Sequence, residues 1–135
     1  MPIFDTPFNP ATDAALVTGA GNGIGRAIAQ ALVAEGVRTV FADINSDTVK
    51  AAIASSAKPT LATPWVGDLA ERSQCDRLFQ DARAALGTIT HFVHSAAPPR
   101  READHALAVS DETWSRMRAV NVDAGFFSAA KSPGR

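Results

Sequence analysis

The sequence of 135 residues has one cysteine, no tyrosine and a formal net charge of −1. A lone cysteine excludes an internal disulfide and any CxxC metal or redox site. Its spacing to later apolar residues is helical, so Cys75 is expected in the core of the protein, on a helix. A charge this close to zero lacks the basic surface that nucleic acid or an anionic membrane would bind, so neither partner is expected.

Metal-binding and targeting patterns are also missing. The three histidines lack ligand spacing and carboxylate or cysteine companions, so no metal site is expected; they are His91, His94 and His105. No apolar run is long enough to span a membrane, and residues 1–12 contain no Lys or Arg, unlike a signal or transit peptide. We therefore expect a cytoplasmic protein in which residues 1–12 form a short extended leader.

Apolar residues are plentiful enough for one domain. Hydrophobic residues make up 46% of the chain and charged residues 20%. These fractions are typical of a soluble globular domain that can bury a sizeable core. Residues 1–135 are therefore expected to form a single domain.

The motif around which the chain is organised runs from Ala14 to Gly25. Apolar or β-branched residues lead straight into Gly19, and Gly23 and Gly25 precede a periodic helical segment. A strand that turns sharply into a helix leaves free backbone N–H groups at the helix N-terminus, where a pyrophosphate binds well. Asp43 ends the next apolar run, 18 residues after Gly25, which favours dinucleotide binding over a purely structural glycine turn.

Each residue of this motif has an expected task. Gly19 would allow the tight turn, Gly23 would let a phosphate approach the backbone, and Gly25 would let the helix lie close to the strands. The carboxylate of Asp43 can accept hydrogen bonds from an adenosine ribose and would repel a 2′-phosphate, which favours NAD over NADP. Arg38, nearby in the sequence, leaves NADP open, and a solvated turn is the alternative role for Asp43.

Alternating strand and helix patterns predict a doubly wound α/β fold with a parallel sheet in the order 3-2-1-4. Pro64 cannot donate to a ladder, which favours an edge position for the third strand. In the first helix, Ala27 and Ala31 are expected to pack closely on the sheet. The expected strands are residues 15–18, 37–42, 61–66 and 88–94, and the expected helices are residues 24–36, 46–57, a third ending at 87, and 111–131 capped by Ser110.

The glycine spacing TGxxxGxG that begins at Thr18 resembles the short-chain dehydrogenase/reductase family. The resemblance implies a Rossmann-type, NAD(P)-binding domain of an enzyme that transfers hydride between a nicotinamide cofactor, here NAD, and a small alcohol or carbonyl substrate. Asp68 would contact the adenine, although it could equally cap a helix. The residues thereby assigned to the cofactor are Thr18, Gly19, Asn22, Gly23, Ile24, Gly25, Asp43, Ile44, Asp68, Leu69, Ser95, Ala96 and Ala97.

The end of the fourth predicted strand resembles the family's NAG segment, which stabilises the sheet and borders the cofactor. Ser95 stands where that segment usually has Asn, and Ala97 where it has Gly. Small residues are still present where the cofactor backbone would come close. We therefore expect Ser95 to Ala97 to form a wall of the cofactor site.

Asn121 lies in line with large apolar residues on one face of the last predicted helix, so its amide is expected to need a partner. The apolar-face series is Trp114, Met117, Ala124 and Ser128. A core asparagine bonded to neighbouring backbone is one explanation. The segment also resembles the family's helix that bears a catalytic Asn, whose distortion holds a water for the proton relay, and Asn121 matches that position.

The absence of tyrosine bears on catalysis. The family's proton donor is the Tyr of a YxxxK motif, assisted by its Lys and by a Ser, and the family places all three after the point where this sequence ends. We therefore expect a chain truncated after the fourth β-α unit, inactive alone, whose complete form is a homo-oligomer. An artificial end, a gene fragment or a frameshifted tail would each explain this, and a non-catalytic nucleotide-binding or interaction module is the alternative.

Truncation would also leave apolar surface uncovered. Without a fifth strand, residues 88–94 would form an exposed edge at which Ile89, Phe92 and Val93 meet water. The last helix would lack partners for its large apolar residues, which are Trp114, Val120, Phe126 and Phe127. We therefore expect a marginally stable or self-associating protein.

Overall fold

The computed structural model describes residues 8–99 and 105–131. Its four parallel strands have the order β3-β2-β1-β4, which confirms the predicted topology. Pro64 lies in the edge strand β3, as its missing N–H predicts. The strands are β1 (Ala14–Thr18), β2 (Arg38–Asp43), β3 (Ala62–Val66) and β4 (His91–His94).

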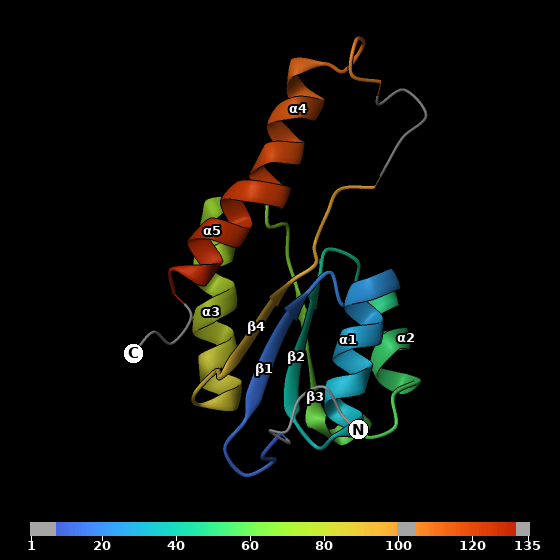
Figure 1. Cartoon of the computed structure of the whole chain (residues 1–135), viewed down its shortest axis with the longest axis vertical. Helices are drawn as coiled ribbons and strands as arrows, with labels where there is room; N and C mark the ends of the chain where they lie inside the picture. Colours follow the sequence, from blue (N-terminus) through green and yellow to red (C-terminus); the bar gives the residue numbers. More distant parts are fainter. Residues whose placement is uncertain (1–7, 100–104, 132–135) are drawn as a thin grey trace, which may run out of the picture.

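Helices cover both faces of this sheet (Figure 1). One face carries α1 (Gly23–Ala34) and α2 (Ser46–Ala54), and the other carries α3 (Arg72–Leu86) and α5 (Ala124–Ala129). A short 3-10 turn, η1 (Pro59–Leu61), precedes β3. Helix α4 (Asp111–Arg118) extends away from the sheet, and a π-helical turn, η2 (Ala119–Asp123), joins it to α5. The fold is therefore doubly wound α/β. Among the described residues, no helix is long and apolar enough to cross a membrane.

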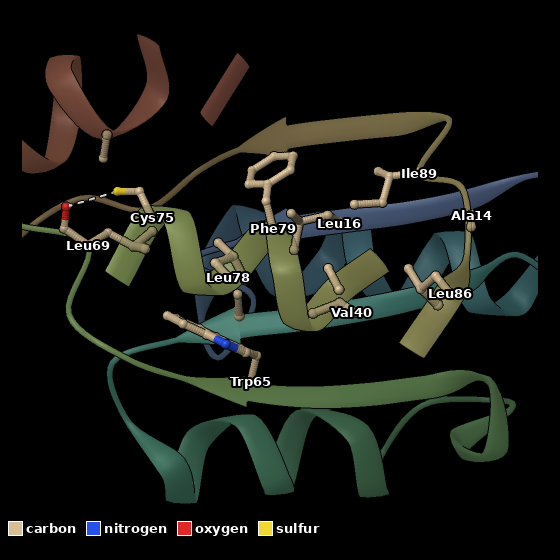
Figure 2. Packing of buried hydrophobic residues seen from close by; sticks show 13 residues of the cluster. Ala14, Leu16, Val40, Trp65, Leu69, Cys75, Leu78, Phe79, Leu86 and Ile89 are labelled. Atoms are coloured by element: carbon tan, nitrogen blue, oxygen red, sulfur yellow. Dashed lines mark hydrogen bonds between the residues drawn. The ribbon is translucent and has the colours of Figure 1, made fainter. Parts of the chain in front are cut away.

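Alternation along β1 divides the core into two clusters, because successive side chains point to opposite faces of a sheet. Leu16 joins the cluster beneath α3, whereas Val17 joins the cluster beneath α1 and α2. In the first cluster, Phe79 of α3 packs over Leu16 (Figure 2). Cys75 belongs to the same cluster and is 1% exposed, which confirms its predicted place in the core.

The buried face of α1 differs from the prediction. The helix buries Gly25, Ala29, Leu32 and Val33. Ala27 and Ala31, expected against the sheet, are exposed. The expectation was wrong because it counted the helical series from Ile24, which lies in the first turn of the helix and is 76% exposed.

The last predicted helix is interrupted. Ser110 caps its start as predicted, since its side-chain oxygen accepts the Thr113 N–H at 3.1 Å. The π-turn η2 then adds a residue to one turn and rotates the faces on its two sides relative to each other. Trp114 lies in α4, which buries none of its residues, and is 60% exposed; Asn121 is also exposed, whereas Ala124 is buried. The single apolar face was therefore wrong, and burial does not explain Asn121.

The edge formed by β4 is better covered than expected. Ile89 is 1% exposed and Val120 is 6% exposed, so both expectations of exposure were wrong. Ile89 precedes the short strand and packs into the cluster beneath α3 (Figure 2). Phe92 and Val93 are half-buried against the two clusters.

The predicted leader falls partly outside the described residues, since residues 1–7 are not among them. The described part contains a turn in which the Asp13 N–H donates to the Asn9 carbonyl at 2.7 Å. This part of the leader is therefore not extended.

Candidate functional site

The glycine turn between β1 and α1 lies at the carboxyl edge of the sheet. Gly19 and Gly23 have φ values of +68° and +55°, in the region that favours glycine. A Cβ on Gly25 would lie 2.2 Å from the Gly19 carbonyl oxygen, so only glycine lets α1 begin this close to β1. A Cβ on Gly23 would meet nothing within 4 Å, so the turn is open to a ligand on this side.

The N-terminus of α1 carries no counter-charge from its own first turn. Asn22 caps the helix, with its side-chain oxygen accepting the Gly23 N–H at 2.8 Å, and the first turn contains no acidic residue. The partial positive charge of the helix end is therefore available to an anion such as phosphate. Ile24, the residue after Gly23 in the first turn of α1, has an exposed side chain.

Asp43, at the end of β2, organises the neighbouring backbone. One carboxylate oxygen accepts the Gly21 N–H at 3.0 Å, and the other accepts the N–H groups of Ile44 at 2.7 Å and Asn45 at 3.2 Å. A carboxylate offers about four acceptor positions, so one remains on the oxygen that faces Gly21. Asp43 therefore shapes the turn and can still receive one hydroxyl group.

Gly21 was not among the residues predicted for the site, although its N–H and its lack of a side chain help to position Asp43. A Cβ at this position would lie 2.4 Å from the Thr48 hydroxyl oxygen and 3.0 Å from a carboxylate oxygen of Asp43. The signal that could have identified it was its place inside the glycine turn. A larger residue would push Asp43 out of its present position.

Arg38 lies far from this group. It begins β2 and stands in register with Ala14, whereas Asp43 ends the same strand. Five residue steps along an extended strand cover roughly 16 Å. Arg38, which is near Asp43 in the sequence, is therefore at the opposite, amino edge of the sheet in the structure.

Asp68 follows β3 at the same carboxyl edge. Its carboxylate accepts the Ala70 N–H at 3.0 Å and two hydrogen bonds from the Arg116 guanidinium at 3.0 and 3.3 Å. Burial raises the pKa of Asp68, but the Ala70 N–H and the Arg116 charge outweigh burial and lower it below its ordinary value of 3.8. Asp68 is therefore an ionised acceptor at neutral pH. Sequence reasoning missed Arg116, for which no local pattern exists.

Leu69 has its side chain in the core. It is 7% exposed, and its carbonyl accepts the Cys75 thiol at 3.6 Å (Figure 2). A ligand at this edge could therefore meet only the backbone of Leu69. Ile44, by contrast, is 55% exposed beside Asp43.

Thr18 holds the segment after β4 against the glycine turn. Its side chain is fully buried, and its hydroxyl oxygen accepts the N–H groups of Ser95 at 3.1 Å and Ala96 at 3.2 Å. A Cβ on Gly19 would lie 2.7 Å from the Ser95 carbonyl oxygen, which shows how close the two segments are. Ala97 follows and is exposed. The Thr18 side chain is therefore closed to direct contact with a ligand, and it holds the adjoining segment in place.

Asn121 lies in the π-turn η2, on the side of the molecule reached by β4. The carbonyl of the preceding residue, Val120, hydrogen-bonds Nε2 of His94 at 2.9 Å, and Nδ1 of His94 hydrogen-bonds the Thr18 hydroxyl at 3.0 Å. In the sequence, His94 was assigned only to the end of the fourth strand, with no role for its imidazole and no metal site expected. The signal that could have identified it was its place at the end of the strand next to β1.

Comparison with known proteins gives a consistent result. The family model described as short chain dehydrogenase matches residues 13–132. Sorbitol dehydrogenase from Cereibacter sphaeroides is 32% identical over 113 residues, which are 84% of this chain and 43% of that protein. Galactitol 2-dehydrogenase (L-tagatose-forming) from the same organism is 34% identical over 121 residues, which are 90% of this chain and 46% of that protein.

Solved structures agree with these relatives. A short-chain glucose/ribitol dehydrogenase from Brucella melitensis has a TM-score of 0.82 and 27% identity, covering 93% of this chain and 52% of its own. A 3-ketoacyl-(acyl-carrier-protein) reductase from that organism, solved with NADH, has a TM-score of 0.79 at 22% identity and covers 89% of this chain and 48% of its own, so it supports the fold alone. The chain spans about half the length of the relatives it matches.

Proposed function

The chain belongs to the short-chain dehydrogenase/reductase family, and on that basis we propose that it forms the NAD(H)-binding part of an oxidoreductase acting on a small alcohol or carbonyl compound. The observation that carries this proposal is the grouping of an open glycine turn, an ionised Asp68 and a partly free Asp43 at one edge of the sheet. Open α/β sheets bind nucleotides at this edge.

The residues at this edge fit a dinucleotide. The amide groups around Gly23 at the start of α1 would hold the pyrophosphate, and the remaining acceptor position of Asp43 would receive a ribose hydroxyl. Ile24 and Ile44 expose apolar side chains that would lie against the adenosine portion. Asp68 would accept from the adenine amino group.

Two further groups would line the nicotinamide end. The segment from Ser95 to Ala97 would form the wall that Thr18 holds in place, and the exposed Asn121 would hold a water of the proton relay. The bound nicotinamide supplies or accepts the hydride. The proton donor that family membership implies is a tyrosine, and the 135 residues contain none. We therefore propose that the chain by itself binds cofactor without turning over substrate.

NAD is the proposed cofactor, because the Asp43 carboxylate would repel the 2′-phosphate of NADP. Arg38, at the opposite end of β2, is too far away to neutralise that phosphate. We further propose a cytoplasmic location and, for a complete enzyme, a homo-oligomer. Polyols are suitable first substrates because two similar proteins are named sorbitol and galactitol dehydrogenases.

Calorimetric titration with NADH and NADPH tests the cofactor proposal. We expect NADH to bind at least about tenfold more tightly than NADPH, because the Asp43 carboxylate would repel the additional phosphate of NADPH. Asp43→Asn keeps an acceptor oxygen but removes the charge, so it should bring the two affinities close together. Asp47→Asn, an exposed carboxylate in the first turn of α2, is the matched control and should change neither. Tighter NADPH binding, or an unchanged preference in Asp43→Asn, would refute the assignment.

Activity assays on the purified chain test the proposal that it does not turn over substrate. A panel of polyols with NAD, and of the corresponding carbonyl compounds with NADH, should give no turnover. Turnover by the 135-residue chain would show that another residue supplies the proton.

A further inference from the structure

His94 makes two hydrogen bonds in opposite directions. It ends β4 directly beside Thr18, its partner in the register of β1 and β4. Nδ1 lies 3.0 Å from the Thr18 hydroxyl oxygen, and Nε2 lies 2.9 Å from the Val120 carbonyl oxygen in η2. One imidazole ring thus touches both the end of the glycine-turn strand and the turn that carries Asn121.

The surrounding hydrogen bonds define which nitrogen carries the proton. The Thr18 oxygen already accepts two backbone N–H groups, from Ser95 and Ala96, which uses both of its acceptor positions. Its hydroxyl proton must therefore be donated to Nδ1 of His94. A neutral imidazole that accepts at Nδ1 carries its proton on Nε2, and that N–H donates to the Val120 carbonyl. Every polar atom of this network is satisfied in that tautomer.

The π-turn makes the Val120 carbonyl available. In an α-helix the N–H of Ala124 would donate to Val120, but here it donates to Ala119. The carbonyl that the π-turn releases from the helix ladder is thus the one that His94 contacts. The ring is also held by packing, since a Cβ on Gly125 would lie 2.9 Å from Cδ2 of His94. Glycine at this position leaves room for the imidazole.

We propose that His94 is a positioning residue, which fixes the wall formed by Ser95 and Ala96 and the π-turn bearing Asn121 relative to each other. Its acceptor nitrogen orients the Thr18 hydroxyl, and through it the wall segment. Its donor nitrogen stabilises the π-turn by satisfying the Val120 carbonyl. The bridge itself follows from the hydrogen bonds, and only its effect on cofactor binding rests on the proposed function.

The tautomer can be tested on the unmodified protein. A two-bond proton–nitrogen correlation spectrum of the neutral form distinguishes the two imidazole tautomers. We expect His94 to carry its proton on Nε2. A proton on Nδ1 would overturn the bridge, because Thr18 could not then donate to that nitrogen.

Two conservative variants separate the two arms of the bridge. His94→Asn places an amide oxygen near Nδ1 and keeps the Thr18 bond, whereas His94→Gln places an amide N–H near Nε2 and keeps the Val120 bond. We expect amide exchange to rise about tenfold at Ala124 in the Asn variant and at Ser95 and Ala96 in the Gln variant. His94→Phe should raise exchange at all three amides. If the Asn and Gln variants change the same amides, the proposal is wrong.

Cofactor titration of the same variants connects the bridge to the site. NADH affinity should stay within about twofold of the unmodified protein in His94→Asn and fall about tenfold in His94→Gln and His94→Phe, since these two leave the Thr18 hydroxyl without its acceptor. Unchanged affinity in His94→Phe would overturn the positioning role while the proposed function stood. If the unmodified protein binds no NADH, the proposed function fails, and the exchange pattern still decides whether the bridge exists.

Discussion

Arg116 of α4 holds both carboxylate oxygens of Asp68, at 3.0 and 3.3 Å, although the two residues are 48 positions apart in the chain. Helix α4 buries none of its residues. The ion pair therefore fastens an otherwise projecting helix to the carboxyl edge of the sheet. It also lowers the pKa of the carboxyl group that is proposed to accept from the adenine.

Arg116→Gln should lower stability in a pH-dependent way. Since the folded pKa of Asp68 lies below 3.8, its contribution is complete above 3.8 and is lost as the pH falls through the lower folded value. The side chains are 43% and 35% exposed, so solvent screening limits the loss at pH 7 to about 1 kcal/mol or less. Denaturant unfolding at pH 7 and below pH 3 measures the difference. Arg118→Gln, whose partner Asp123 is 3.7 Å away, is the control and should have a smaller effect.

Gly23→Val should weaken NADH binding by at least about a hundredfold, because the new side chain would occupy the open space where phosphate approaches the backbone. Gly87→Val provides a matched control, since Gly87 also has a positive φ and open space around it but lies at the end of α3. Both variants should lose similar stability from backbone strain, about 1–3 kcal/mol. Equal NADH affinities in the two variants would mean that Gly23 only shapes the turn.

The thiol of Cys75 should react slowly with alkylating reagents in the folded protein. It is 1% exposed and donates to the Leu69 carbonyl, and burial raises its pKa above the ordinary value of 9.0. Thiolate is the reactive form, so modification requires local opening. The rate should therefore rise in step with denaturant concentration. Fast modification in native buffer would show that the region between α3 and η2 is open.

Self-association should depend on the apolar side chains exposed near the end of the chain. Trp114, Val122 and Phe126 are 60%, 59% and 69% exposed. Changing Trp114 and Phe126 to Ser should shift the protein towards monomer in sedimentation velocity experiments. Ile24→Ser, which removes an equally exposed residue at the other side of the sheet, should leave the distribution unchanged. A monodisperse wild-type monomer at all concentrations would contradict this prediction.

The sheet order could be predicted because its signals are local. Glycine spacing, the alternation of strand and helix patterns and Pro64 each act within a few residues. The expected lack of partners for Trp114 and Phe126 is confirmed, since both are exposed. The place of the π-turn could not be predicted from local periodicity; its Val120 carbonyl contacts His94, 26 residues earlier in the chain. Helical periodicity was extended through that turn, which placed Trp114 and Asn121 on the wrong face.

The residues of the candidate site also differ in whether a local sequence signal could predict them. The glycine turn and Asp43 follow from spacing in one stretch of sequence, and their placement at one edge follows from parallel strands. Arg116 had no such signal, because its partner lies on a different element. His94 did have one: in the predicted order it ends the strand beside Thr18, so their proximity was implied. What the sequence lacked was the direction of the imidazole ring, which Gly125 and η2 determine.

The pairing of β1 with β4, in which Thr18 stands beside His94, also has a consequence for synthesis, because β4 is the last of the four strands to be made. Strands β1, β2 and β3 are complete by Val66, whereas β4 ends at His94. At about 5–20 residues per second, a ribosome leaves a gap of seconds in which β1 lacks its second neighbour. All five residues of β1 are buried in the finished fold, so during this gap an apolar strand forms the open edge of a nascent three-stranded sheet. We expect this interval to be the time at which the chain is most exposed to pairing with other chains and most dependent on chaperones.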